Sequence, residues 1–184
     1  MKTKKILSIA LFALVFGATS FAQKSVMVGG AAMYPTKNII ENAINSKDHT
    51  TLVAAVKAAG LVETLQSAGP FTVFAPTNAA FDKLPKGTVE TLLKPENLKM
   101  LQSILTYHVV AGKMSSSDLM KAVKAGNGKA MLKTVNGASL TVWMKGDKLI
   151  VSDEKGGKSM VTIADVFQSN GVIFVVDTVL MPKK

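Results

Sequence analysis

The sequence contains neither cysteine nor arginine, and the two absences exclude several classes of protein. A chain without cysteine has no disulfide framework, no thiol nucleophile and no N-terminal cysteine that could carry a lipid anchor. Its stability must therefore come from a hydrophobic core, which a chain of this length can form. All 22 basic residues are lysines, so no guanidinium group can bind phosphate or guanine in a bidentate manner. We therefore expect no specific recognition of nucleic acid.

The sequence also has little that could support catalysis or metal binding. Its two histidines, His49 and His108, have no partners at the spacing of a zinc site. It contains no nucleophile elbow, no phosphate-binding glycine loop and no dinucleotide-binding fingerprint. Ser115 and Asp118 could form a hydrolytic set with His108, but their spacing already fits a helix capping box. We therefore expect a protein that is not an enzyme and that needs no cofactor or metal.

The longest apolar run lies at the start of the chain and is too short to span a membrane. Three lysines within the first five residues precede the apolar residues 6–16, and the small-residue segment 20–22 follows. A helix that crosses a bilayer needs about 20 apolar residues. We therefore predict that residues 1–22 are a signal peptide, with a retained membrane anchor as the alternative. Cleavage after Ala22 would leave a secreted chain, periplasmic or extracellular, with no membrane span.

Removal of the signal peptide lowers the formal net charge from +10 to +7, because three of the 22 lysines leave and all 12 acidic residues stay (19 − 12 = +7). The remaining lysines are scattered along the sequence without interleaved aromatic residues. This pattern is typical of a solvated surface. It also allows weak, salt-sensitive attraction to acidic polymers, including acidic glycans.

The hydrophobic periodicity changes from helical to extended along the chain, which predicts an α+β fold. Residues 23–35 show no helical period, so we interpret them as an N-terminal arm. Apolar residues then recur at helical spacing through the first half. After Gly128 the pattern is that of strands, with two-residue turns at Asn136-Gly137 and Gly146-Asp147. We expect one domain over residues 36–184, with the early helices packed on a sheet wedge or sandwich formed mainly by the second half.

Capping residues mark the start of two expected helices. Asp48 precedes a stretch of helical spacing that stops at Gly60. Ser115, with Asp118 three residues later, has the spacing of a capping box.

The segment GPFTVFAPTNAAFDKLP, residues 69–85, combines a short apolar strand with the start of a helix. A buried strand over residues 72–74 is followed by Thr77 and Asn78. Either of these two residues can cap the helical turn that carries Phe81. A strand that feeds a capped turn in this way is the most distinctive local pattern in the chain.

Two further segments complete the pattern: residues 105–110 (LTYHVV) and residues 170–182 (NGVIFVVDTVLMP). In this order and at this spacing, the three segments resemble those of the fasciclin domain, an adhesion and interaction module. The resemblance covers residues 38–182 and implies the fasciclin-like α+β fold. The motif residues of its two outer segments are Phe71, Phe74, Pro76, Thr77, Asn78, Phe81, Asn170, Gly171 and Asp177.

The dipeptide Asn170-Gly171 is interpreted as a tight turn, like the other two Asn-Gly pairs at 127–128 and 136–137. Asparagine tolerates a positive φ better than most residues, and glycine adopts it freely. We therefore expect Asn170 to need a positive φ.

The resemblance also implies a function, namely secretion followed by adhesion to a cell-surface or extracellular matrix protein or polysaccharide. In that family the Tyr-His segment, here Tyr107 and His108, has been implicated in cell binding. Asp165 stands where some members carry an Asp-Ile recognition motif. Both interpretations have a structural alternative. His108 could be a half-buried histidine bonded to the backbone, and Asp165 could be an aspartate that flanks a turn. The chain departs from the family at Phe174, where a histidine is common, so His108 should lack its usual counterpart.

A carrier of an apolar small molecule, such as a carotenoid, is the alternative function. Some proteins that resemble fasciclin hold carotenoids on a hydrophobic face. The five phenylalanines at 71, 74, 81, 167 and 174, together with the methionines, could line such a site, although a core role explains the phenylalanines equally well.

Overall fold

The computed structural model describes residues 24–183, so the predicted signal peptide at residues 1–22 lies outside the described residues. Helices come mainly first and strands mainly second, which confirms the α+β prediction. The helical elements are α1 (Ile39–Ala43), η1 (Lys47–His49), α2 (Thr50–Ala58), α3 (Val62–Gln66), α4 (Asn78–Asp82), α5 (Thr88–Leu92), η2 (Pro95–Asn97), α6 (Leu98–Tyr107) and α7 (Ser116–Ala125). The strands are β1 (Val26–Val28), β2 (Ala31–Met33), β3 (Phe71–Pro76), β4 (Val109–Ala111), β5 (Lys129–Lys133), β6 (Ser139–Lys145), β7 (Lys148–Ser152), β8 (Lys158–Gln168) and β9 (Gly171–Val176). Within residues 24–183, none of the helices has both the length and the hydropathy that a bilayer span requires.

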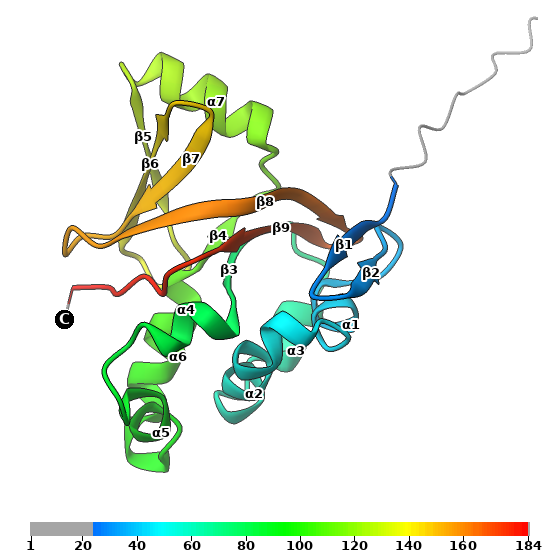
Figure 1. The fold of residues 1–184 in the computed structure, drawn as a ribbon, viewed down its shortest axis with the longest axis vertical. Coiled ribbons are helices and arrows are strands. Elements are labelled where there is room, and N and C mark those ends of the chain that lie inside the picture. The colour runs from blue at the N-terminus through cyan, green and yellow to red at the C-terminus, as the bar shows by residue number, and fades with distance from the viewer. Residues whose placement is uncertain (1–23, 184) are drawn as a thin grey trace, which may run out of the picture.

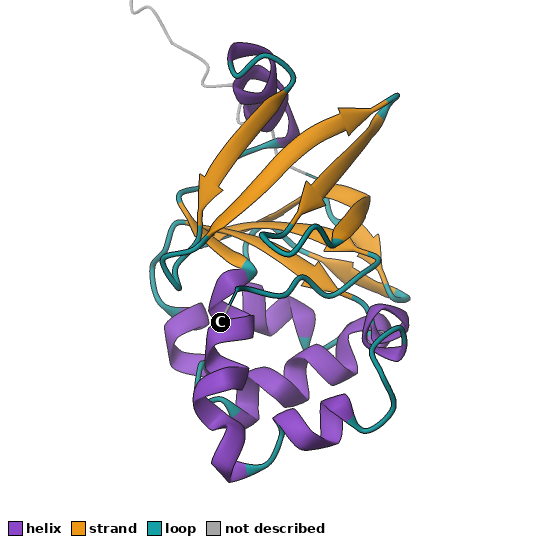
Figure 2. Ribbon diagram, turned by 90° about the vertical axis from the view of Figure 1, so that its left-hand side faces the viewer, coloured by secondary structure: helices purple, strands orange, loops and turns teal. Residues whose placement is uncertain are grey.

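Seven strands form one curved sheet in the order β4-β3-β9-β8-β7-β6-β5, which lies above most of the helices in Figure 2. β3 and β9 run parallel, and the other neighbours in this sheet are antiparallel. The two outer strands approach each other, because Val110 of β4 forms an isolated bridge with Thr134, just after β5. Val135 N also donates to Val109 O at 2.8 Å. These contacts make the sheet barrel-like.

The parallel pairing of β3 and β9 brings two segments of the sequence pattern together. The strands pair residue by residue, from Phe71 opposite Gly171 to Pro76 opposite Val176. About one hundred residues separate the partners along the chain, which the sequence numbering shows directly. The strands of the segments at residues 69–85 and 170–182 therefore lie side by side in the sheet, between β4 and β8.

β9 is buried on both faces because a hydrophobic core lies on either side of it. Ile173 and Val175 belong to the core that the sheet shares with α1–α6. Phe174 and Val176 belong to a second core, which α7 and the inner sides of β5–β8 complete. Figure 1 shows α7 over β5–β7, at the end of the molecule opposite α1–α6. Burial on both faces explains why this strand is continuously apolar in sequence rather than alternating.

The segment interpreted as an N-terminal arm contains a hairpin that packs on the domain. β1 and β2 pair in antiparallel fashion around Gly29 and Gly30, whose φ angles of 57° and 76° suit a tight turn. Val28 and Met33 are buried in the core beside α1–α6. This hairpin therefore contributes to the stability of the domain.

Two predicted helix starts have the expected caps. In α7, Ser115 Oγ accepts from Asp118 N at 3.2 Å, and Asp118 Oδ2 accepts from Ser115 N at 3.0 Å. In α4, Thr77 Oγ1 accepts from Ala80 N at 3.3 Å. Both caps satisfy backbone groups that the first turn of a helix leaves free.

The prediction that Asp48 caps the next helix is wrong. Asp48 lies inside the turn η1, and α2 begins only at Thr50. The start of α2 is instead held from a distance, because Asn78 Oδ1 accepts from Thr51 N at 3.0 Å. Asn78 Nδ2 also donates to Lys47 O at 2.8 Å. The side chain of Asn78 thus links two helices that are separate in sequence.

Candidate interaction surfaces

Tyr107, at the end of α6, is buried and its hydroxyl is fully bonded. Tyr107 Oη donates to Ser139 O at 2.8 Å and accepts from Glu154 N at 3.1 Å. Burial raises the pKa of Tyr107 to about 12, so the phenol stays neutral. A partner on the surface could not touch this ring without opening the second core.

His108 is only 3% exposed, and both of its ring nitrogens have backbone partners. Nδ1 lies 2.8 Å from Ile104 O, which can only accept, so Nδ1 carries the proton. Nε2 then accepts from Leu180 N at 3.0 Å. This geometry matches the alternative of a histidine bonded to the backbone. A role for Tyr107 or His108 in binding a partner stays a prediction.

The stability of the fold should fall as the pH drops from about 6.5 to 4, and His108 is the main reason. Desolvation lowers the pKa of His108 to about 4, and the Ile104 carbonyl and Asp153 oppose this only in part. The unfolded histidine binds its proton near pH 6.5, so the unfolded state holds more protons across this window. We expect a loss of up to about 3 kcal/mol.

Urea unfolding midpoints, measured at several pH values between 7 and 4, check this prediction. Desolvation also lowers the pKa of His49, so its effect on stability has the same sign. A His108→Gln variant should therefore keep only part of the pH dependence. A wild-type midpoint that is constant over the window would contradict the burial of both rings.

Asp165 lies at a bulge in β8 and anchors α7. Its φ is 55°, and the β8–β9 register shifts between Ile163 and Val166. Asp165 Oδ1 accepts from Ser116 N at 2.7 Å, and its second oxygen accepts from the Ser116 hydroxyl. Its partners lie on α7, whereas those of His108 lie on α6 and in the C-terminal segment. The structure therefore does not join Asp165 to the Tyr-His pair in one site.

Asn170 does not have the positive φ predicted for it; among the described residues other than glycine, only Asn127 and Asp165 do. Its buried side chain is instead a hydrogen-bonding link. Oδ1 accepts from Ile39 N at 3.0 Å, and Nδ2 donates to Leu65 O and Ser67 O, both at 2.8 Å. Asparagine is required here for its side-chain amide, which joins the turn before β9 to α1 and α3.

Asp177, the last motif residue, ties the end of β9 to β8. Its Oδ1 accepts from Met160 N at 2.8 Å, and its Oδ2 lies 3.5 Å from Lys83 Nζ. Partial burial is the largest single effect and raises the pKa of Asp177, but these bonds, with those from Thr178 and Ser159, together outweigh it and lower the pKa. The carboxylate is thus already paired within the domain.

The phenylalanines do not gather on one ligand-binding face. Phe74 and Phe174 pack in the second core with their ring centres 5.6 Å apart, and Phe167 is half-buried beside them. Phe81 and the half-buried Phe71 belong to the other core. Strands β3 and β9 lie between the two groups, because a core packs on each of their faces.

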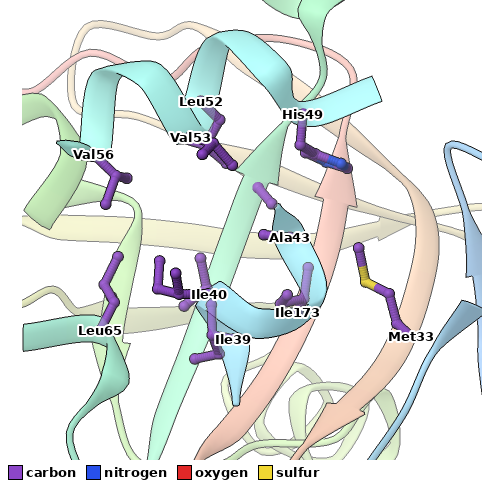
Figure 3. Close-up of a pocket in the computed structure, with 12 residues that line it drawn as sticks. Met33, Ile39, Ile40, Ala43, His49, Leu52, Val53, Val56, Leu65 and Ile173 are labelled. Carbon is purple, nitrogen blue, oxygen red and sulfur yellow. The ribbon is translucent and has the colours of Figure 1, made fainter. Parts of the chain in front are cut away.

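A small apolar cavity lies between α1, α2 and the sheet, as Figure 3 shows. Its volume is about 30 Å³, and its lining is apolar except for His49. His49 Nδ1 lies 2.9 Å from Ser46 Oγ. Nε2 has no hydrogen-bond partner among the described residues. Burial lowers the pKa of this ring, and the backbone of Ala75 opposes that effect. The volume is comparable to that of one or two water molecules.

The outer side of β5–β8 gathers lysines around Trp143, the only tryptophan in the sequence. Trp143 pairs with Lys129 across the β5–β6 ladder, and Lys145 lies two residues further along the same face of β6. Lys145 pairs in turn with Lys148 across the β6–β7 turn. Lys158 Nζ lies 5.7 Å from the centre of a Trp143 ring. We call these five residues the basic face.

The basic face is accessible, and its charges are not neutralised by nearby carboxylates. All four lysines are exposed, and none of them forms an ion pair within residues 24–183. A groove of about 440 Å³ runs along the face. It is lined by Trp143, Lys145, Lys148, Lys158, Ile150, Ser159, Met160 and Asp177. A grooved surface of this kind can bind an extended anionic partner by charge and by aromatic contact.

These lysines are scattered along the sequence, and the prediction of a merely solvated surface did not include the basic face. Two signals for it were present, namely the i, i+2 spacing of Trp143 and Lys145 and the predicted β6–β7 turn that sets Lys148 opposite Lys145. The positions of Lys129 and Lys158 depend on strand register, which the sequence pattern does not give.

Comparison with known proteins identifies the fold and several relatives. The fasciclin domain model matches residues 47–182. Protein sll1483 from Synechocystis is 47% identical over 160 residues, which cover 87% of this chain and 82% of that protein. Immunogenic protein MPB70 from Mycobacterium bovis is 41% identical over 145 residues, covering 76% of this chain and 66% of MPB70.

Two further matches carry names that mention the cell surface or adhesion. Cell surface glycolipoprotein MPB83 from Mycobacterium bovis is 36% identical over 166 residues, covering 88% of this chain and 68% of that protein. The structure of a FAS1 domain pair from the insect cell adhesion molecule Fasciclin I superimposes with a TM-score of 0.68 at 19% identity. That match covers 77% of this chain and 50% of the insect chain, and it supports the fold alone.

Proposed function

The chain belongs to the fasciclin domain family, and we propose that it is a secreted adhesion or interaction protein that binds a cell-surface or extracellular matrix component. The basic face is the contact surface in this proposal. The proposed activity is binding, with no chemical step. Residues 1–22 have the pattern of a signal peptide and would direct export to the periplasm or to the outside of the cell.

The observation that carries the proposal is the half-buried tryptophan among four lysines that form no ion pair within residues 24–183. Trp143 lies on the outer side of the sheet, in a groove whose lining includes three of these lysines together with the apolar residues Ile150 and Met160. Tryptophan contributes large contact areas at protein interfaces. By contrast, the other candidates are occupied inside the domain, because Tyr107 and His108 are buried and Asp165 bonds to Ser116. The names of MPB83 and of Fasciclin I, which mention the cell surface and adhesion, agree with a surface-binding role.

An apolar carrier is the second candidate, and the cavity at His49 is the observation that favours it. The buried, unpartnered Nε2 could bond to one polar group of a ligand whose apolar part fills the cavity. A volume of about 30 Å³ is, however, far too small for a carotenoid without rearrangement of α1 and α2. A visible absorption band in the purified native protein would favour this second function.

The adhesion proposal is tested with two triple variants that change the net charge equally. The face variant is Lys145→Gln/Lys148→Gln/Lys158→Gln. The helix variant is Lys86→Gln/Lys94→Gln/Lys99→Gln, whose exposed lysines lie on and around α5 and α6. We expect the face variant to lose most of its binding to surface and matrix material from the producing organism, and the helix variant to bind like wild type. Equal losses in the two variants would mean that attraction is spread over the whole surface, and the proposal would fail.

A further inference from the structure

We infer that the partner of the basic face is an acidic polysaccharide, in which a sugar ring stacks on Trp143 and neighbouring carboxylates or sulfates meet the lysines. This inference rests on the proposed function and names the partner of the same surface. It commits to a polymer that has both sugar rings and regularly placed negative charges.

The indole of Trp143 is held in place as a platform. Nε1 donates to Ser152 Oγ at 3.0 Å, which fixes the ring across β6 and β7. Directly opposite Trp143 on β7 lies Ile150, which is 7% exposed. Ile150 pairs in turn with Met160 on β8, so an apolar row continues beside the indole. The apolar C–H face of a sugar ring suits such a platform, and its hydroxyl groups stay in water at the edges.

The charges around the platform are positive and belong to exposed lysines. Lys129 lies beside Trp143 on β5, and Lys145 lies beyond it on β6. Lys158 rests over the indole at 5.7 Å and is exposed, so its flexible chain can turn to an anionic group when a sugar ring takes its place. The lysine ammonium is a point charge without fixed orientation, which suits carboxylates and sulfates spaced along a polymer.

The nearby carboxylates leave this positive field in place. Asp177 lines the same groove, but it is bonded to Met160 N and paired with Lys83. Asp147 is in the β6–β7 turn and lines a separate groove beneath α7. Glu154 Oε1 accepts from Ser139 N, at the other end of β6 from Lys145. The polyanion would therefore cross the indole of Trp143, from Lys145 and Lys148 at one end of β6 and β7 to Lys158, whose backbone pairs with Ser152 at the other end of β7.

Nucleic acid fits this surface less well than a polysaccharide. The chain has no arginine, and its single tryptophan cannot stack a series of bases. Attraction to the phosphates alone would be diffuse, so it would not depend on Trp143 or on the position of a lysine.

The single tryptophan makes the test direct, because all tryptophan fluorescence comes from the proposed site. The mature chain is titrated with alginate as a polyuronate, dextran sulfate as a sulfated glucan, uncharged dextran, and single-stranded DNA. We expect a saturable change in tryptophan emission with alginate, with dextran sulfate or with both. Comparison of the two polymers then shows whether the site prefers carboxylates or sulfates. Equal responses to uncharged dextran or to DNA, or no response to either acidic polymer, would overturn the inference.

Variants then locate the contact on the face. The face variant loses three exposed lysine contacts, so its dissociation constant for the acidic polymer should rise on the order of tenfold. The dissociation constant of the helix variant should stay within about twofold of the wild-type value. Variants without Trp143 give no tryptophan signal, so their binding is measured by calorimetry. Trp143→Ala should lose binding, and Trp143→Phe should keep part of it. Far-ultraviolet circular dichroism checks that each variant is folded. Equal weakening in the two lysine variants would again overturn the inference.

The two proposals can fail separately. If the face variant loses matrix binding while wild type binds neither acidic polymer, the contact surface stands and the polysaccharide inference is wrong. If the acidic polymers bind at Trp143 but matrix binding is the same in both lysine variants, the polysaccharide site stands and its role in adhesion is wrong.

Discussion

Replacing Phe74 with alanine should lower the free energy of unfolding by roughly 3–5 kcal/mol. Phe74 is fully buried in the second core, and its ring centre lies 5.6 Å from that of Phe174. The substitution removes the apolar contacts of the Phe74 ring and leaves a cavity in the second core, beneath two paired strands that cannot easily move in to fill it. A loss of this size is a large part of the 5–15 kcal/mol that stabilises a typical domain.

Urea unfolding midpoints measure this effect, and Phe167→Ala is the matched control. Phe167 is half-buried at the edge of the same core, so its truncation should cost clearly less. If the two variants lost equal stability, or if Phe74→Ala unfolded like wild type, the position of Phe74 at the centre of this core would be wrong.

Asn170→Val should cost roughly 3–5 kcal/mol, the second largest effect that we expect. The valine has nearly the size of asparagine but leaves Ile39 N, Leu65 O and Ser67 O without their side-chain partner. Each buried polar group that loses its bond costs about 1–3 kcal/mol, and water can reach Ser67 O in part.

Asn170→Gly separates this explanation from the backbone explanation that the sequence suggests. A residue required for a positive φ would be replaced by glycine at little cost. Because the side-chain amide is what the structure uses, we expect Asn170→Gly to be about as unstable as Asn170→Val. A glycine variant of wild-type stability would restore the interpretation of a tight turn with a left-handed asparagine.

Local signals in the sequence were enough to predict much of the fold. The capping box of Ser115 and Asp118, the cap at Thr77 and the two-residue turn at 146–147 all depend on residues close together in the chain. The turn at 136–137 is longer than the two residues predicted, because the last strand pair before it is Lys133 with Ser139. Long-range partners were not predictable in this way. The link from Asn78 to α2 and the link from Asn170 to α1 and α3 join residues 27 to 131 positions apart.

The candidate site was harder to predict than the fold, for the same physical reason. Tyr107, His108 and Asp165 were selected by resemblance, and the structure gives each of them hydrogen-bond partners inside the domain. The basic face exists only after four strands pair in a definite register. A one-residue shift in the β7–β8 register would turn Lys158 to the other side of the sheet.

Acetylation of lysines in the native chain, measured residue by residue with and without bound matrix material, tests most directly where the contact surface lies. We predict that matrix protects Lys145, Lys148 and Lys158 from the reagent and leaves Lys86, Lys94 and Lys99 as reactive as in the free protein. Uniform protection of all six lysines, or protection confined to the three on and around α5 and α6, would contradict the assignment of adhesion to the basic face.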